Sequence, residues 1–220
     1  MTILTIESLC SEANIFSAIE SAHPEPLLYG VTDGKAVGTY LEHKFRLYLK
    51  DRYDFAEGNS AIGIDLPSLL IDIKVTSIRQ PQSSCPFKSA RQKIFGLGYG
   101  LIIFVYDKTD DSINRTGNLN IRHTIYVCSE RTADFQMTRG IHNILKNEGN
   151  KDDLIAFMID RNLPVDEIEL SNIADEIIAN PPIQGFLTIS NALQWRLQYG
   201  RVIELAGQEE GLVAVYRNNP

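Results

Sequence analysis

The sequence has few cysteines and no long apolar run, and both absences narrow the class of protein. Its three cysteines stand far apart among 220 residues without a CxxC pair, which argues against a disulfide framework and a zinc site. The longest apolar runs, such as residues 101–106, are far shorter than the ~20 residues of a membrane span. Glu7 and Glu12 stand where a signal peptide would be basic, so we expect a cytoplasmic protein with no membrane partner.

Motifs of several enzyme classes are missing as well. Gly96, Gly98 and Gly100 do not make the GxGxxG of a dinucleotide site, and they precede a predicted strand instead of following one. No serine stands in a GxSxG motif. With 44% hydrophobic and 22% charged residues, the composition is that of a globular protein, and the length suits one domain, residues 1–220.

Acidic residues are absent from two long stretches, although the net charge is −7. Residues 148–176 contain nine acidic and two basic residues, so this segment alone accounts for the excess. Residues 73–106 contain five basic residues and no acid, and residues 181–203 contain two basic residues and no acid. A basic face is therefore available for a polyanion, although two solvated surfaces would give the same pattern.

The spacing of apolar residues predicts an α/β or α+β protein with a central mixed β-sheet flanked by helices. We expect a core at about residues 36–130, where a tight turn joins the strands 61–65 and 69–76, and a helical C-terminal portion at about 131–220 that reads DNA or dimerises. Residues 107–118 are rich in turn formers, and we expect them to form a connection between two strands. The other predicted strands are 101–106 and 123–128, and the predicted helices are one or two before residue 23, then 36–50, 87–95, 132–147, 152–160, 165–179 and 190–199.

Two carboxylates and a lysine form the most informative constellation. Asp65 ends the first strand of the predicted hairpin, and Asp72 and Lys74 share one face of the second because strand side chains alternate. Adjacent carboxylates repel unless a cation lies between them, and Mg²⁺ prefers such oxygens. Lys74 could deprotonate or orient the attacking water and offset phosphate charge. Glu42, on the preceding predicted helix, could be a third ligand. A strand with a charged, solvent-exposed face would also contain the DxK pattern without any metal site.

These residues resemble a known superfamily of nucleases. Gly63-Ile64-Asp65-Leu66-Pro67 followed by Asp72-Ile73-Lys74 is similar to the PD-(D/E)xK motif, and the spacing D-x6-D-x-K is similar to that of the mismatch-repair nicking enzyme MutH and its restriction-enzyme relatives. The resemblance covers about residues 36–106 and implies a restriction-endonuclease-like fold, metal-ligand roles for Asp65 and Asp72, a catalytic role for Lys74 and an accessory acidic role for Glu42. Ile64 replaces the family's proline, and Asp72 stands where Glu is common. Residues 80–87 and 190–196 also look like segments of type II restriction endonucleases.

Polar side chains suited to DNA gather in two parts of the sequence. Arginine pairs with guanine and amide side chains pair with adenine in the major groove, whereas lysine and arginine also contact phosphates. Helix positions that are simply exposed to solvent would contain similar polar residues without contacting DNA. The candidates are Gln80, Gln82, Ser83 and Ser84 in a loop, Lys88, Arg91 and Lys93 for phosphates, and Asn191, Gln194, Arg196 and Arg201 in and just beyond the last predicted helix.

The sequence therefore predicts a Mg²⁺-dependent, site-specific endonuclease of double-stranded DNA, a type II restriction enzyme that leaves 5′-phosphates. A symmetric site implies a homodimer, with a cognate DNA methyltransferase as genetic partner. Two alternatives remain at this point. One is a repair or structure-selective nuclease of the same fold, and the other is a non-catalytic DNA-binding protein with a decayed site.

Overall fold

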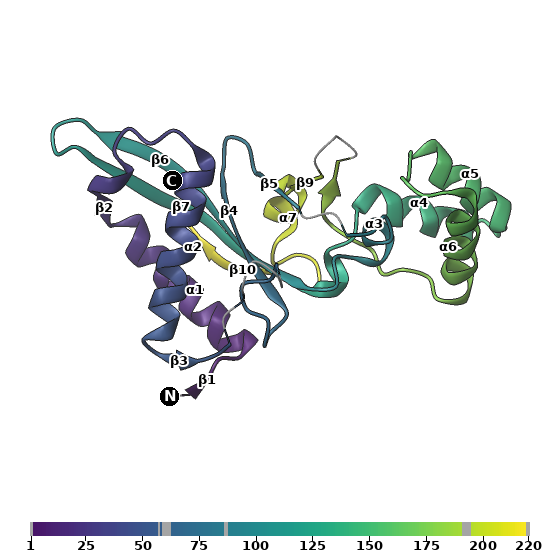
Figure 1. Cartoon of the computed structure of the whole chain (residues 1–220), viewed down its shortest axis with the longest axis horizontal. Coiled ribbons are helices and arrows are strands. Elements are labelled where there is room, and N and C mark those ends of the chain that lie inside the picture. The colour runs from purple at the N-terminus through teal and green to yellow at the C-terminus, as the bar shows by residue number, and fades with distance from the viewer. Residues whose placement is uncertain (1, 57, 59–62, 86–87, 191–194, 219–220) are drawn as a thin grey trace.

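A mixed β-sheet forms the centre of the computed structural model, which describes residues 2–56, 58, 63–85, 88–190 and 195–218. Within these residues the sheet order is β10 (Leu212–Arg217), β7 (Thr116–Val127), β6 (Gly100–Asp111) and β4 (Ile71–Ser77), and β2 (Pro24–Glu25) also pairs with β7. Strand β4 is parallel to β6, whereas β7 is antiparallel to both of its neighbours, β6 and β10. The predicted mixed central sheet is confirmed, with β4 at its edge (Figure 1).

Two long helices cover one face of this sheet, namely α1 (Ile6–Ser21) and α2 (Gly34–Lys50) (Figure 1). Leu41, Phe45 and Leu49 recur along α2 and are fully buried against the sheet. The predicted helix 36–50 is confirmed and begins two residues earlier, because the Asp33 side chain caps it by accepting the Lys35 N–H. Short elements complete this side: β1 (Thr2–Ile3), paired in parallel with β3 (Tyr53–Asp54), and the 3₁₀ turn Pro26–Leu28.

The opposite face of the sheet is covered by the C-terminal segments. Strands β8 (Thr188–Ile189) and β9 (Arg196–Gln198) pair with β5 (Gln82–Ser84) in a small sheet, and α7 (Gly200–Leu205) follows. Leu197 and Tyr199 are fully buried in the same cluster as Leu101, Ile103 and Val105 of β6. This cluster is separate from the one beneath α1 and α2, so the all-apolar strand 101–106 is buried on both faces, as its sequence indicates.

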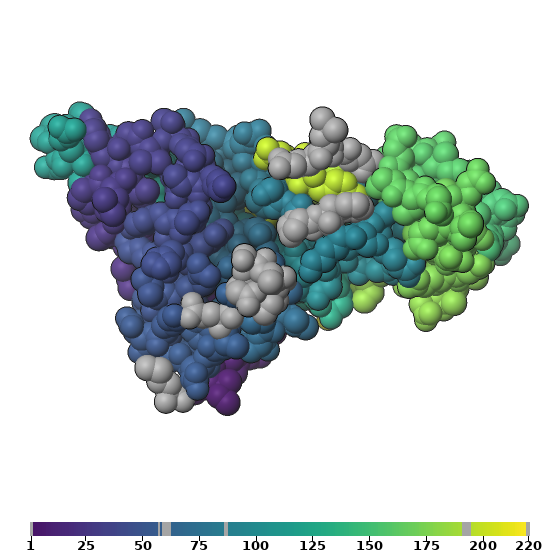
Figure 2. Space-filling view, viewed as in Figure 1, coloured from purple at the N-terminus to yellow at the C-terminus, as the bar shows by residue number. Residues whose placement is uncertain are grey.

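A helical part lies at one end of the molecule (Figure 1), and Figure 2 shows it in green at the opposite end from α1 and α2. It consists of α4 (Phe135–Lys146), α5 (Lys151–Asp160) and α6 (Glu167–Ala179), together with the short α3 (Gln92–Phe95) from earlier in the chain. The 3₁₀ turn Ser129–Arg131 precedes α4. Ile94, Met137 and Ile173 belong to its own hydrophobic cluster. The predicted helices 132–147, 152–160 and 165–179 are confirmed with shifted ends. No helix in the described ranges combines the length and apolar character that a membrane crossing needs.

Four of the predicted elements are wrong. Trp195, Leu197 and Tyr199 are buried while Arg196 and Gln198 are exposed, so this part of the predicted helix 190–199 is the strand β9. The predicted helix 87–95 is helical only at Gln92–Phe95 within the described residues. Residues 107–118 mostly continue β6 and β7, and the reversal is confined to residues 112–115. Residues 63–65 of the predicted strand 61–65 are not a strand, and residues 61 and 62 lie outside the described residues. The strand β10 was not predicted.

Candidate active site

The edge strand β4 carries two of the predicted site residues. Asp72 Oδ2 lies 2.6 Å from Lys74 Nζ, and the exposed fractions of these side chains are only 5% and 16%. Ile71 and Ile73 point to the other face and pack in the cluster beneath α2. The alternation predicted from the sequence therefore places a buried ion pair on one face of β4 and anchors the strand by its other face.

A tight turn returns the chain so that Asp65 lies beside β4. Leu66 and Ile71 exchange two backbone hydrogen bonds, with N···O distances of 2.9 and 3.2 Å. Asp65 Oδ2 then accepts the backbone N–H of Ile73 at 3.0 Å, and its Oδ1 lies 3.6 Å from an Arg46 guanidinium nitrogen. Arg46 is on α2, one turn after Glu42, and sequence reasoning missed it because the contact depends on where the turn brings Asp65.

The carboxylates of this site are close enough to perturb one another. Burial raises the pKa of Glu42 to about 7, and the charge of Asp65 acts in the same direction. Burial likewise raises the pKa of Asp72 to about 6, opposed by Lys74 and assisted by Asp65. Burial alone would lower the pKa of Lys74, but the surrounding carboxylates outweigh it and raise that pKa, so the ammonium is charged at neutral pH. The structure therefore brings Asp65, Asp72 and Lys74 together on and beside β4, with Glu42 near enough for its pKa to respond to their charges.

The carboxylates of Glu42, Asp65 and Asp72 are donors that suit a hard divalent cation, but their present arrangement does not form a complete metal-binding site. Across the described residues, no three His, Cys, Asp or Glu side chains are placed to hold a metal ion. The ammonium of Lys74 lies at Asp72 Oδ2, where a cation would bind. That oxygen is buried and contacts the Lys74 ammonium at 2.6 Å, and carboxylate oxygens are ligands that a hard cation prefers.

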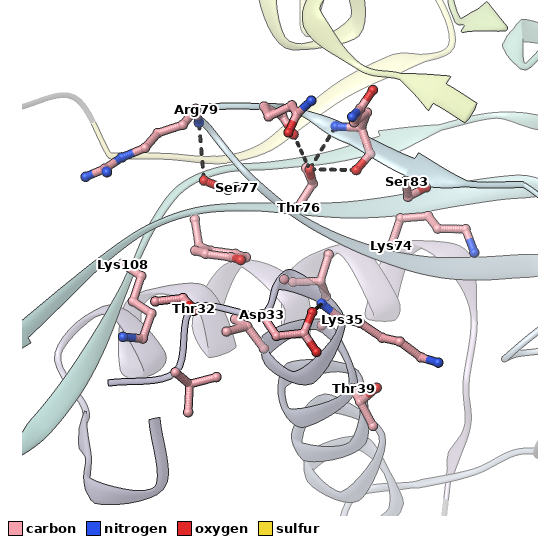
Figure 3. Close-up of a pocket in the computed structure, with 18 of the residues that line it drawn as sticks. Thr32, Asp33, Lys35, Thr39, Lys74, Thr76, Ser77, Arg79, Ser83 and Lys108 are labelled. Carbon is pink, nitrogen blue, oxygen red and sulfur yellow. Dashed lines mark hydrogen bonds between the residues drawn. The ribbon is translucent and has the colours of Figure 1, made fainter. Parts of the chain in front are cut away.

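A cleft of about 1020 Å³ lies next to these residues, between the start of α2 and the strands β4 and β5. In Figure 3, Thr32, Asp33, Lys35 and Thr39 lie on one side, and Thr76, Ser77, Arg79 and Ser83 lie on the other, with Lys74 and Lys108 nearby. Glu42 also lines the cleft. The positive residues of the lining outnumber the negative ones: they are Lys35, Lys74, Arg79, Lys108 and Arg196, against Asp33, Glu42 and Asp110.

Several predicted DNA-reading residues lie in this cleft. Gln80, Gln82, Ser83, Ser84 and Arg196 all contribute to its lining, although Arg196 is more than 100 residues from the others in the sequence. Sequence reasoning missed Lys35, Arg79 and Lys108 as cleft residues. The acid-free stretch contains Arg79, which was a usable signal, whereas nothing local marks Lys35 or Lys108.

The remaining predicted DNA contacts lie elsewhere. Lys93 is 5% exposed and lies 5.2 Å from the Trp195 ring centroid, which corrects the expectation of a surface phosphate contact. Arg91 forms ion pairs with Glu169 and Glu176 of α6, so it anchors the helical part. Arg201 lies over the Phe135 ring at 3.6 Å from its centroid. Lys88 is exposed, and Asn191 and Gln194 lie outside the described residues.

Acidic residues beside a charged lysine, at the wall of a polar cleft on a mixed sheet, are features of a nuclease, the class that the sequence motif also indicates. The chain matches the family model of the type II restriction enzyme NspV over residues 3–214. It is 81% identical over 220 residues to the type II restriction enzyme NspV of Nostoc sp. (strain ATCC 29411 / PCC 7524), and the alignment covers both chains completely. No solved structure matches it. The chain belongs to the type II restriction enzyme NspV family and is a site-specific deoxyribonuclease, with DNA as its substrate.

Proposed function

We propose that the chain cuts both strands of duplex DNA in a Mg²⁺-dependent reaction as a member of the PD-(D/E)xK superfamily, with Asp65, Asp72 and Glu42 as metal-binding carboxylates. The observation that carries this proposal is the gathering of these carboxylates and Lys74 beside a positively lined cleft. Family membership favours a restriction enzyme over a repair nuclease or a non-catalytic DNA-binding protein.

Hydrolysis of a phosphodiester adds water to phosphorus and releases the 3′ oxygen, which takes up a proton, so the products are a 5′-phosphate and a 3′-hydroxyl. A bound Mg²⁺ supplies a Lewis acid that lowers the pKa of a coordinated water and offsets charge on the phosphate. Lys74 is placed to donate a hydrogen bond to a phosphate oxygen as negative charge develops there. The raised pKa of Lys74 supports this role over that of a general base.

We infer that the ion pair between Lys74 and Asp72 is the DNA-free arrangement of this site and that a second arrangement forms with DNA. Without DNA, the ammonium neutralises the buried Asp72 carboxylate. A phosphate in the cleft would offer Lys74 an oxygen in place of its carboxylate partner, and Asp72 would then be one of the carboxylates that hold a metal. Asp65 keeps its orientation throughout, because the Ile73 N–H and Arg46 hold its two oxygens from different sides.

Cutting both strands of a symmetric site requires two active sites related by a two-fold axis. We therefore propose a homodimer in the cytoplasm, where a cognate methyltransferase protects the host DNA. Sedimentation in the presence of cognate duplex measures this directly, since each chain has a mass of 24.7 kDa. A complex that contains a single chain would contradict the dimer.

Incubation of unmethylated phage DNA with the enzyme tests the proposal. With Mg²⁺ we expect discrete fragments whose ends a ligase rejoins without prior phosphorylation, because the 5′-phosphate is retained. With EDTA we expect DNA binding in a gel shift and no cutting. Equal cleavage in EDTA would contradict the metal requirement, and ends that need a kinase before ligation would contradict the bond assigned.

A further inference from the structure

Two polar segments that are distant in sequence form neighbouring strands at the cleft. Strand β5 pairs antiparallel with β9, so Gln82 lies opposite Gln198 and Ser84 lies opposite Arg196. Strand β8 pairs with the other edge of β9. The residues that approach the cleft from β5 and β9 are therefore held in a fixed register by backbone hydrogen bonds.

The two faces of this ribbon differ in polarity. Leu197 is fully buried, and its cross-strand neighbour Ser83 places its hydroxyl 2.5 Å from the hydroxyl of the buried Tyr199. Because directly paired residues share a face and successive residues alternate, the other face carries Gln82, Ser84, Arg196 and Gln198. Ser84, Arg196 and Gln198 are exposed, and Gln82, Ser84 and Arg196 line the cleft, whereas Gln198 lies just beyond its lining. This set of four is called the ribbon face below.

The ribbon is fastened to the catalytic strand close to Lys74. Thr76 is buried two residues after Lys74 on β4, and its hydroxyl accepts the Gln82 N–H at 2.9 Å. The same hydroxyl lies 3.2 and 3.1 Å from the carbonyl oxygens of Gln80 and Gln82, as the dashed lines in Figure 3 show. Tyr199 N–H also donates to the Pro81 carbonyl at 2.8 Å. The ribbon face therefore has a defined position relative to β4 and Lys74.

We propose that the ribbon face reads base edges in the major groove, with Arg196 recognising guanine and with Gln82 and Gln198 recognising adenine. A two-stranded ribbon fits the major groove, arginine matches the two acceptors of guanine, and glutamine matches the acceptor and donor of adenine. Arg196 is exposed in the cleft lining and has no carboxylate partner among the described residues, unlike Arg91. This inference rests on the proposed function, because the cleft must hold the duplex.

The other cations of the cleft serve a different purpose. Lys35 and Arg79 lie on the two sides of the cleft but outside the ribbon face, with Lys108 nearby (Figure 3). We assign them to phosphates, which fix the register of DNA and carry no base information. Arg196 and Gln198 are two residues apart on a strand that rises about 3.3 Å per residue, so they reach base pairs within about two steps of each other.

Binding measured one base pair at a time tests the assignment of Arg196. The site is first mapped from fragments cut by the unaltered enzyme, and affinities are then measured in EDTA for the cognate duplex and each single substitution. Arg196→Lys keeps the charge but loses the two-pronged guanine contact. We expect it to keep its affinity for unrelated DNA and to lose about 10- to 100-fold of discrimination at G·C pairs alone. Arg139→Ala, in the exposed part of α4, is the control and should discriminate as the unaltered enzyme does.

Gln198→Ala gives an independent result should Arg196 variants fold poorly, which a thermal melt reports. It should weaken the discrimination at an A·T pair that lies within two base-pair steps of the pair affected by Arg196→Lys. Unchanged discrimination in Arg196→Lys, uniform weakening at every position, or a mapped site without G·C would each overturn the assignment. Site-specific cutting by the unaltered enzyme stays intact in all three cases, so the proposed function fails only if that cutting is absent.

Discussion

Residue by residue, the site depends on how buried charges compensate one another. The alternation of Asp72 and Lys74 along β4 could be predicted because it is local to seven residues. The position of Asp65 could also be predicted, since a turn of a few residues leaves little choice. The contact of Arg46 with Asp65 could not, because it depends on the packing of α2 against the turn. The burial of Lys93 was missed for the same reason: it depends on Trp195, about 100 residues away.

The raised pKa values of Glu42, about 7, and Asp72, about 6, predict how pH changes metal binding. Both carboxyls ionise near pH 4 when unfolded. The folded form therefore holds their protons more tightly, and the stability this contributes below pH 4 is lost as pH rises through 6 to 7. Mg²⁺ should relieve this loss, so its effect on Tm should be larger at pH 8 than at pH 5.5.

Glu42→Gln is the matched variant for this measurement. Because its side chain does not ionise, it should gain stability relative to the unaltered protein as pH rises, and its Mg²⁺ response should be smaller at pH 8. Thermal melts with Mg²⁺ and with EDTA at both pH values give the comparison. A Mg²⁺ effect on Tm that is equal at the two pH values would count against the carboxylate cluster as the metal site.

At the scale of elements, β4 links the chemistry to DNA reading. The helix α2 and the strands β4 and β6 could be predicted because their apolar periodicities are strong and local. The ribbon of β5 and β9 could not, because its pairing joins residues more than 100 positions apart and its strands are only three residues long. From residue 195 to residue 199 the sequence alternates between apolar and polar residues, as a strand with one buried face does. The neighbouring polar residues, however, resembled the N-terminus of a helix.

Thr76→Val should loosen the attachment of the ribbon to β4. The change keeps the shape of the side chain but removes the hydroxyl that accepts the Gln82 N–H and lies near the Gln80 and Gln82 carbonyls. The N–H keeps the Gln80 carbonyl at 2.8 Å as a second acceptor, so we expect a cost of about 0.5–1.5 kcal/mol. For a chain of this length that corresponds to a fall in Tm of a few degrees. Thr109→Val, on an exposed stretch of β6, is the control and should change Tm little.

The functional consequence of Thr76→Val should exceed its effect on stability. We expect cutting at near-cognate sites to rise relative to cutting at the cognate site, because the ribbon face is held less firmly. Rates on the two duplexes below the new Tm measure this ratio. A variant with lowered Tm but an unchanged ratio would show that Thr76 supports the fold without positioning the ribbon.

For the whole molecule, three hydrophobic clusters separate distinct tasks. The cluster beneath α1 and α2 supports the site carboxylates, and the cluster on the other face supports the ribbon. The third cluster builds the helical part, which carries most of the negative charge, and Arg91 ties it to the segment after β5. Composition indicated this division of charge, but only the fold shows that the positive residues converge on one cleft while the acidic helices lie at the far end.

Cleavage by Lys74→Ala under single-turnover conditions, with cognate duplex and Mg²⁺, tests the assigned chemistry most directly. Loss of the ammonium should slow cutting by at least about 10²- to 10³-fold while the affinity for the duplex stays close to that of the unaltered enzyme. Lys146→Ala, in the last turn of α4, should cut at the unaltered rate. Cutting by Lys74→Ala at the unaltered rate, with binding intact, would contradict the role of Lys74 at the reacting phosphate.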